Sequence, residues 1–175
     1  MKFISFAIDP GESSGWAIAL TPDAANASGV ARTPHERVAV CHLVAEYVED
    51  TEYPLVVTAE KWNARGWRNV FYTALGLGRS FGRWLDHIEL ILGVKEQHFL
   101  RFHPNTWKHV IFTADELKGI SREDHKRLVC QYTGVPEHDR ADAMCMAMAT
   151  HSTEEGLKAA ESAVRRAKRA RKKVV

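Results

Sequence analysis

Four carboxylates stand out because each lies where the chain turns or starts a helix. Asp9 follows the apolar run FISFAI, Glu60 follows LVVTA, and Asp139 and Asp142 stand three residues apart. A spacing of three places two side chains on one face of a helix. If the four acids converge, they raise one another's pKa unless a cation neutralises them. The first chemistry to consider is therefore that of a metal site.

Hard oxygen ligands of this kind select Mg²⁺ or Mn²⁺. Two such ions about 3.5–4 Å apart can activate water and stabilise the leaving oxygen of a phosphodiester. We expect Asp9, Glu60, Asp139 and Asp142 to hold two Mg²⁺ (or Mn²⁺) ions per active site, with no nucleotide cofactor. Each acid alone has a simpler interpretation, as a turn residue, a solvated strand end or a helix N-cap. Their combination favours the metal site.

The first half of the chain must place Asp9 and Glu60. Apolar runs on both sides of Asp9-Pro10-Gly11 predict a hairpin. Thr33-Pro34-His35-Glu36 predicts a helix with Thr33 as N-cap and Glu36 closing a capping box. The expected elements are strands over 3–8, 15–20, 28–32 and 55–59, and a helix to about residue 51.

The second half alternates helices with one strand. We expect a long helix over 68–92, a strand over 97–102 and a short helix over 105–112. A further helix is expected from Ser121 to Gly134, and the last core helix begins near Asp139. This order predicts an α/β fold whose mixed sheet is antiparallel at the hairpin, parallel afterwards and flanked by helices. Ligands gather at the carboxyl ends of parallel strands, so Asp9 and Glu60 converge if their strands are neighbours.

Composition limits the class of protein. A chain of 175 residues fits one domain. Cys41, Cys130 and Cys145 have no zinc-ligand spacing and are expected to be buried thiols. No apolar stretch is long enough for a membrane span, and the start lacks the features of a leader, so we expect an intracellular protein that is mature from Met1 and has no membrane partner.

The net charge of +2 hides an asymmetry. Residues 158–175 carry a net charge of +7, which leaves −5 for the rest. We therefore divide the chain into a main domain over 1–152 and a basic C-terminal helix or tail over 153–175. A polyanionic partner would bind the tail, through Arg165, Arg166, Lys168 and Arg169 among others. The simpler alternative is a disordered tail that aids solubility.

Four segments resemble a known family. They are IDPGESSGWAI (8–18), VVTAEKW around Glu60, TALGLGRSFGRWL (73–85) and HDRADAMCMAMATH (138–151). In this order they resemble the RuvC-type Holliday junction resolvases, which are ribonuclease-H-like nucleases, and most of all the versions encoded by bacteriophages. The resemblance covers roughly residues 3–151. It implies a ribonuclease-H-like fold, a homodimer, and paired metal-dependent nicks in a four-way DNA junction in the cytoplasm of a bacterial host.

The resemblance also suggests roles for particular residues. It implies that the four acids are catalytic and that Lys108, in NTWKHVI, and Lys126, in a Lys-x-x-Val pattern, lie near the scissile phosphate. A lysine there could stabilise charge in the transition state. Both could equally be solvated helix lysines.

DNA contacts and a dimer interface are also implied. The family places an aromatic wedge after the second acid, and the candidates here are Trp62 or Trp67, interleaved with Arg65 and Arg68. Gly78 and Gly82 lie four apart in the expected long helix, where glycine costs about 1 kcal/mol relative to alanine. They indicate close approach by another backbone. The resemblance implies that this is the homodimer interface, while the alternative is tight packing on the protein's own sheet.

Three other functions remain open. The main competitor is a different ribonuclease-H-like nuclease that cuts RNA–DNA hybrids or branched DNA in general. A non-catalytic DNA-binding module is disfavoured because carboxylates at a phosphate site are costly without metal ions. An actin-like or sugar-kinase ATPase is suggested by Ser13-Ser14-Gly15 after the first turn, but it needs a second domain of this kind.

Overall fold

A computed structural model describes residues 1–11, 13–61 and 71–173, with side chains except at 71–77, 104 and 171–173. Five strands form one sheet in the order β3-β2-β1-β4-β5. β1 pairs antiparallel with β2, β2 antiparallel with β3, and β1–β4 and β4–β5 are parallel, which confirms the predicted mixed sheet. The strands are β1 (Ile4–Asp9), β2 (Ser14–Ala19), β3 (Ala25–Ala31), β4 (Leu55–Glu60) and β5 (Leu100–Phe102).

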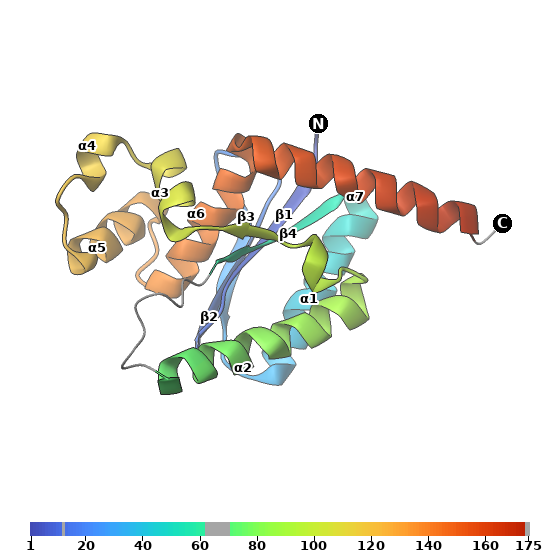
Figure 1. The fold of residues 1–175 in the computed structure, drawn as a ribbon, viewed down its shortest axis with the longest axis horizontal. Helices are drawn as coiled ribbons and strands as arrows, with labels where there is room; N and C mark the ends of the chain where they lie inside the picture. Colours follow the sequence, from blue (N-terminus) through green and yellow to red (C-terminus); the bar gives the residue numbers. More distant parts are fainter. Residues whose placement is uncertain (12, 62–70, 174–175) are drawn as a thin grey trace.

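Helices flank the sheet (Figure 1). The α-helices are α1 (Pro34–Thr51), α2 (Phe71–His87), α3 (Pro104–Ile111), α4 (Ala114–Leu117), α5 (Arg122–Thr133), α6 (His138–Ser152) and α7 (Glu154–Lys173). α2 continues as a π-helical segment, η1 (Ile88–Leu92), and a 3₁₀ turn, η2 (Glu96–His98), precedes β5.

Local hydrogen bonds set the helix ends as predicted. Thr33 and Glu36 form the expected capping box at the start of α1. Ser121 caps α5 by accepting from the backbone N–H of Asp124, and Gly134 ends that helix in the left-handed region at a φ of 71°. Glycine adopts this conformation without the steric cost that other residues meet.

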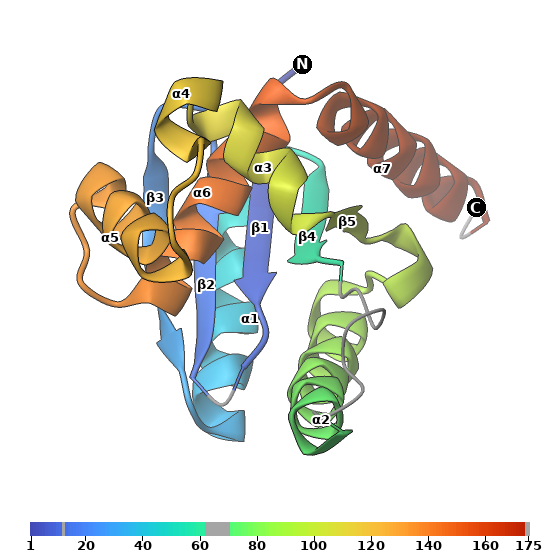
Figure 2. The ribbon, with the colours of Figure 1, turned by 60° about the vertical axis from the view of Figure 1, so that its left-hand side comes forward.

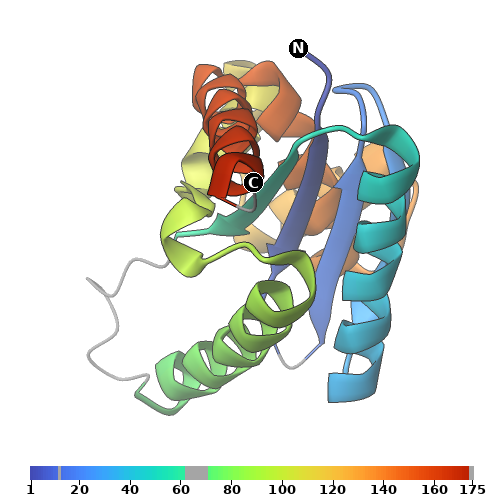
Figure 3. The ribbon, with the colours of Figure 1, turned by 90° about the vertical axis from the view of Figure 1, so that its right-hand side faces the viewer.

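The helices form two layers, one on each face of the sheet (Figures 2 and 3). Side chains alternate along a strand, so β1 presents Ile4, Phe6 and Ile8 to the layer of α1 and α2. Its other face meets α6 through small side chains, Ala7 on β1 and Ala17 on β2. Because these residues are small, α6 lies close against the central strands.

Several boundaries differ from the sequence-based expectations. The third strand begins at Ala25 rather than near 28, because its pairing with β2 extends past a bulge. The strand expected over 97–102 is shorter, since residues 96–98 form a 3₁₀ turn. The expected helix over 68–92 begins at Phe71 among the described residues and ends in π-helix. α4 was not expected, although Thr113 and Glu116 form a capping box there.

Residues 154–173 form a helix, α7, that packs on the body before it projects outward (Figures 1 and 2). Ala160 is fully buried against Phe3 and Val56. The three cysteines are free; Cys41 and Cys145 are buried as expected, and Cys130 is half-buried. No helix in the described ranges has the length and apolar character that crossing a membrane requires.

Candidate active site

Asp9 and Glu60 end two neighbouring parallel strands. β1 and β4 pair with Ile8 beside Ala59, so the next residue on each strand is Asp9 and Glu60 respectively. The period of two along a strand puts both carboxylates on the face covered by α6. The sheet register therefore brings together two acids that are 51 positions apart in the sequence.

α6 adds Asp139 and Asp142 on the same face of the sheet. Its start lies directly over β2, where Gly15 pairs with Asp9. A Cβ atom added to Gly15 would lie 2.8 Å from the backbone nitrogen of Arg140 and closer still to the carbonyl group of Asp139. Only a residue without a side chain permits this approach, so Gly15 sets how near the helix acids come to the strand acids. The N-cap of α6 is Glu137, so the N-cap interpretation of Asp139 is wrong.

Asp9 lies within electrostatic range of the other three acids. Burial raises the pKa of Asp9 well above its usual value, and the charges of Asp142, Glu60 and Asp139 raise it further. Lys108 acts in the opposite direction. A carboxyl group in such surroundings either takes up a proton or requires a cation.

Asp142 has a similar shift. Burial raises its pKa from 3.8 to about 6; nearby His138 lowers it, whereas Glu60 and Asp139 raise it. Between these pKa values the folded protein binds a proton that the unfolded chain has released. The free energy of unfolding therefore falls as the pH rises through this window, and the loss is complete above the folded pKa.

One carboxylate oxygen at this site lacks a partner. His138 Nε2 lies 3.2 Å from Asp142 Oδ2, and His138 Nδ1 lies 3.6 Å from Asp139 Oδ1. The other oxygen of Asp142, Oδ1, is buried and has no hydrogen-bond partner within the described part of the chain. A buried carboxylate oxygen without a partner is costly, and a bound cation would remove that cost.

α3 contributes the remaining polar groups. The indole Nε1 of Trp107 donates to Glu60 Oε1 at 3.2 Å. Trp107 is fully buried, so this bond holds Glu60 to one position. Lys108 follows on the same helix, with its Nζ 5.3 Å from the centre of the Trp107 ring. The structure thus places Lys108 beside the acids.

The donor set suits a hard divalent cation, as four carboxylates and an unpartnered buried oxygen are available. Across residues 1–11, 13–61 and 71–173, however, no three His, Cys, Asp or Glu side chains are grouped closely enough to hold a metal ion as they stand. Like charges repel without a cation, and His138 engages the two α6 acids. Metal binding would therefore require these side chains to close toward one another.

Ser80 on α2 supports the turn that follows Asp9. Its hydroxyl donates to the carbonyl oxygen of Gly11, as does the hydroxyl of Ser14 at 2.9 Å. The two serine hydroxyls are themselves 3.1 Å apart. These contacts connect α2 to the end of β1.

The other expected site residues have varied positions. Lys126 lies on α5 and pairs with Glu123 at 3.2 Å. Among the described lysines, Lys108 rather than Lys126 is the one whose charge lowers the pKa of Asp9 and Asp142. A proposed wedge and its basic neighbours lie outside the described residues: Trp62, Arg65, Trp67 and Arg68. The basic residues Arg165, Arg166, Lys168 and Arg169 lie on α7, where Arg166 is half-buried and the other three are exposed.

Gly78 is exposed, and a Cβ atom added to Gly82 would meet no atom of the described residues within 4 Å. The alternative that Gly82 allows tight packing on the protein's own sheet is therefore wrong. The implied homodimer interface on α2 stays a prediction.

Two residues beside the acids had no expected role. His138 could have been found from its spacing of four from Asp142, which puts both on one helical face. Trp107 could not, because its bond to Glu60 joins residues 47 positions apart. Both act on the orientation of a carboxylate.

The sheet and its flanking helices define a ribonuclease-H-like fold. The chain is similar in structure to RuvC of T. thermophilus, solved in complex with a Holliday junction substrate, with a TM-score of 0.53 and 18% sequence identity. The match covers 85% of this chain and 92% of that chain. No family model and no curated protein matches the sequence.

Proposed function

We propose that this protein is a metal-dependent endonuclease that resolves four-way DNA junctions. The observation that supports it best is the convergence of Asp9, Glu60, Asp139 and Asp142 from two strands and a helix, reflected in the raised pKa of Asp9. The solved structure with a similar fold was determined with a Holliday junction substrate. A symmetric homodimer would present one such site to each of two opposing strands.

The roles follow from the contacts of each residue. The four carboxylates would hold divalent metal, which would supply an activated water and offset the negative charge of the phosphodiester. Trp107 holds Glu60, and His138 lies against Asp142, which would have to leave His138 to bind a metal ion. Lys108, beside the acids, is suited to contact a phosphate oxygen as charge develops.

The experiment compares four substrates in Mg²⁺: a four-way junction, a flap, a linear duplex and an RNA–DNA hybrid. We expect preferential cleavage of the junction. Asp9→Asn and Glu60→Gln should each lower the cleavage rate at least about 100-fold, because each removes a charged metal ligand. Junction binding, measured by gel shift in Ca²⁺, should persist.

Exposed acids on α1 provide matched controls. Asp50→Asn and Glu46→Gln make the same chemical changes far from the sheet edge and should leave cleavage unchanged. Full activity in Asp9→Asn or Glu60→Gln would contradict the active-site assignment. Preference for the hybrid, or equal cleavage of all branched substrates, would instead favour a general ribonuclease-H-like nuclease.

A further inference from the structure

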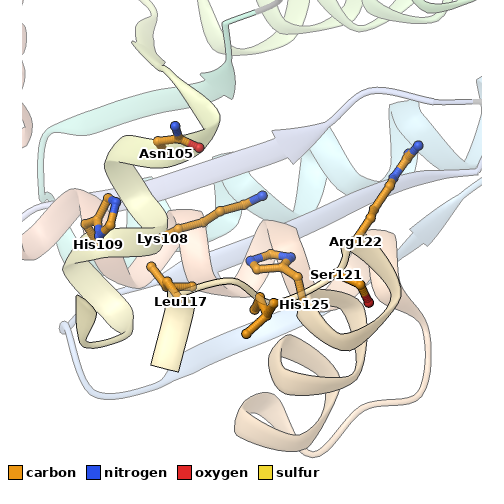
Figure 4. Close-up of a pocket in the computed structure, with 8 residues that line it drawn as sticks. Asn105, Lys108, His109, Leu117, Ser121, Arg122 and His125 are labelled. Atoms are coloured by element: carbon orange, nitrogen blue, oxygen red, sulfur yellow. The ribbon is translucent and has the colours of Figure 1, made fainter. Parts of the chain in front are cut away.

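A cavity lies between α3 and the start of α5, lined by polar side chains together with Leu117 and Ile120 (Figure 4). Its volume is about 370 Å³. Lys108 and Asn105 line it from α3, and Ser121, Arg122 and His125 from α5. The proposed function uses only Lys108 from this group.

The charge of the lining is positive. Lys108 and Arg122 contribute cations from opposite elements, and no carboxylate lines the cavity among the residues that the structure describes. The two acids in the first turn of α5 have partners of their own: Glu123 pairs with Lys126 at 3.2 Å, and Asp124 pairs with Arg127 at 3.3 Å and accepts from the Ser121 hydroxyl at 2.7 Å. The cavity is therefore suited to an anion.

The start of α5 adds backbone donors. Ser121 is the N-cap, and its side chain satisfies the N–H group of Asp124. The N–H groups of the first helical residues, Arg122 and Glu123, have no acceptor within a helix. Together with the helix dipole, such groups favour a phosphate at a helix N-terminus.

His125 independently indicates a ligand. Its side chain lines the cavity and is only 9% exposed, yet its Nε2 is buried with no hydrogen-bond partner in the described part of the chain. Trp107 and Phe112 hold the ring by edge contacts, with ring centres 6.1 and 6.3 Å away. In Figure 4 the imidazole faces the side chain of Lys108. Burial lowers the pKa of His125 to about 4, so the ring is neutral at physiological pH and one of its two nitrogens carries a proton.

We propose that this cavity binds a backbone phosphate adjacent to the scissile one in the DNA strand being cut. The proposal rests on the proposed nuclease function and extends it. Lys108 connects the two positions, because it lines the cavity and its charge also acts on Asp9 and Asp142. A strand that presents one phosphate to the acids would thus present a neighbouring phosphate to Arg122, His125 and the start of α5.

The first experiment tests the cavity with inorganic phosphate, using the full chain and no DNA. NMR signals of the His125 imidazole should shift saturably in the wild type. Arg122→Gln should weaken this binding about tenfold, because it removes a charge-assisted hydrogen bond to the anion. The control is Arg127→Gln, on the same helix but paired with Asp124 and outside the cavity lining; it should bind phosphate as the wild type does.

The second experiment tests whether the natural anion is DNA. Single methylphosphonate linkages, which lack the charge, are placed in turn on both sides of the scissile phosphate of a junction. At one linkage the wild type should lose about tenfold in affinity, and Arg122→Gln should lose nothing more there, because the contact is already gone. Arg122→Gln should also lower the log–log salt slope of junction binding by about 1.

The outcomes separate the two proposals. Junction cleavage with losses that add independently at every linkage would overturn the phosphate site and leave the nuclease proposal standing. Phosphate binding at His125 with neither binding nor cleavage of branched DNA would overturn both the nuclease proposal and the assignment of the cavity to DNA. No shift of His125 with phosphate, in a folded wild type, would overturn the anion site itself.

Discussion

Replacing Gly15 with alanine tests how the structure positions the helix acids. The added Cβ would lie 2.8 Å from the backbone nitrogen of Arg140 and nearer to the carbonyl group of Asp139, within the 3.0 Å that real Cβ atoms respect. No side-chain rotation can relieve a clash with backbone. The start of α6 must therefore retreat by roughly 1 Å from Asp9, a displacement that can cost about 100-fold in rate. Overpacking should also cost about 1–3 kcal/mol of stability.

The assay is single-turnover cleavage of a four-way junction at saturating enzyme, so that weaker binding does not limit the rate. Urea unfolding measures the stability of the same samples, and circular dichroism shows that the variant is folded. A Gly15→Ala protein with wild-type stability and wild-type cleavage would refute the reasoning.

Three further predictions concern charge and assembly. Asp142→Asn should raise the free energy of unfolding at pH 7.5 in EDTA by up to about 3 kcal/mol, because the pKa shift from 3.8 to about 6 is lost. The variant should also show a smaller decline of that free energy between pH 3.8 and about 6. Urea-unfolding curves that match the wild type at every pH would contradict this prediction. Arg165 and Arg169 are both exposed on α7, and replacing them with glutamine should lower the log–log salt slope of junction binding by about 2. An unaltered slope in gel shifts would show that these two arginines contact no phosphate. Gly78→Leu with Gly82→Leu should convert a dimer to a monomer by light scattering and turn linear products from a cruciform plasmid into open circles. A wild type that is monomeric at micromolar concentration and yields open circles only would count against resolution by paired nicks.

The test of α7 uses substitutions rather than truncation for a structural reason. Removing residues from 158 onward would also remove Ala160, which is buried against Phe3 and Val56. The lost packing would destabilise the body, and a change in DNA binding could then not be attributed to charge.

The sequence alone was sufficient where the signal is local. The capping residues Thr33 and Ser121 bond to backbone three positions away, so their helices start where the sequence predicts. The apolar runs around Asp9 predicted the hairpin, and the spacing of Asp139 and Asp142 placed both on one helix. Strand lengths were less predictable. A strand was expected over residues 97–102, but only Leu100–Phe102 pair with β4, and the residues before them form a 3₁₀ turn.

Only the tertiary structure decided how the parts of the site meet. The pairing of β1 with β4 put Asp9 beside Glu60, and the absence of a side chain at Gly15 let α6 approach. The hydrogen bond from Trp107 to Glu60 and the lining of the cavity between α3 and α5 likewise bring together segments that no regular sequence spacing relates. Local signals depend on a few neighbouring side chains and the backbone. The contacts of the site depend instead on the packing of the whole core, because that packing sets the strand register and the distances between elements far apart in the chain.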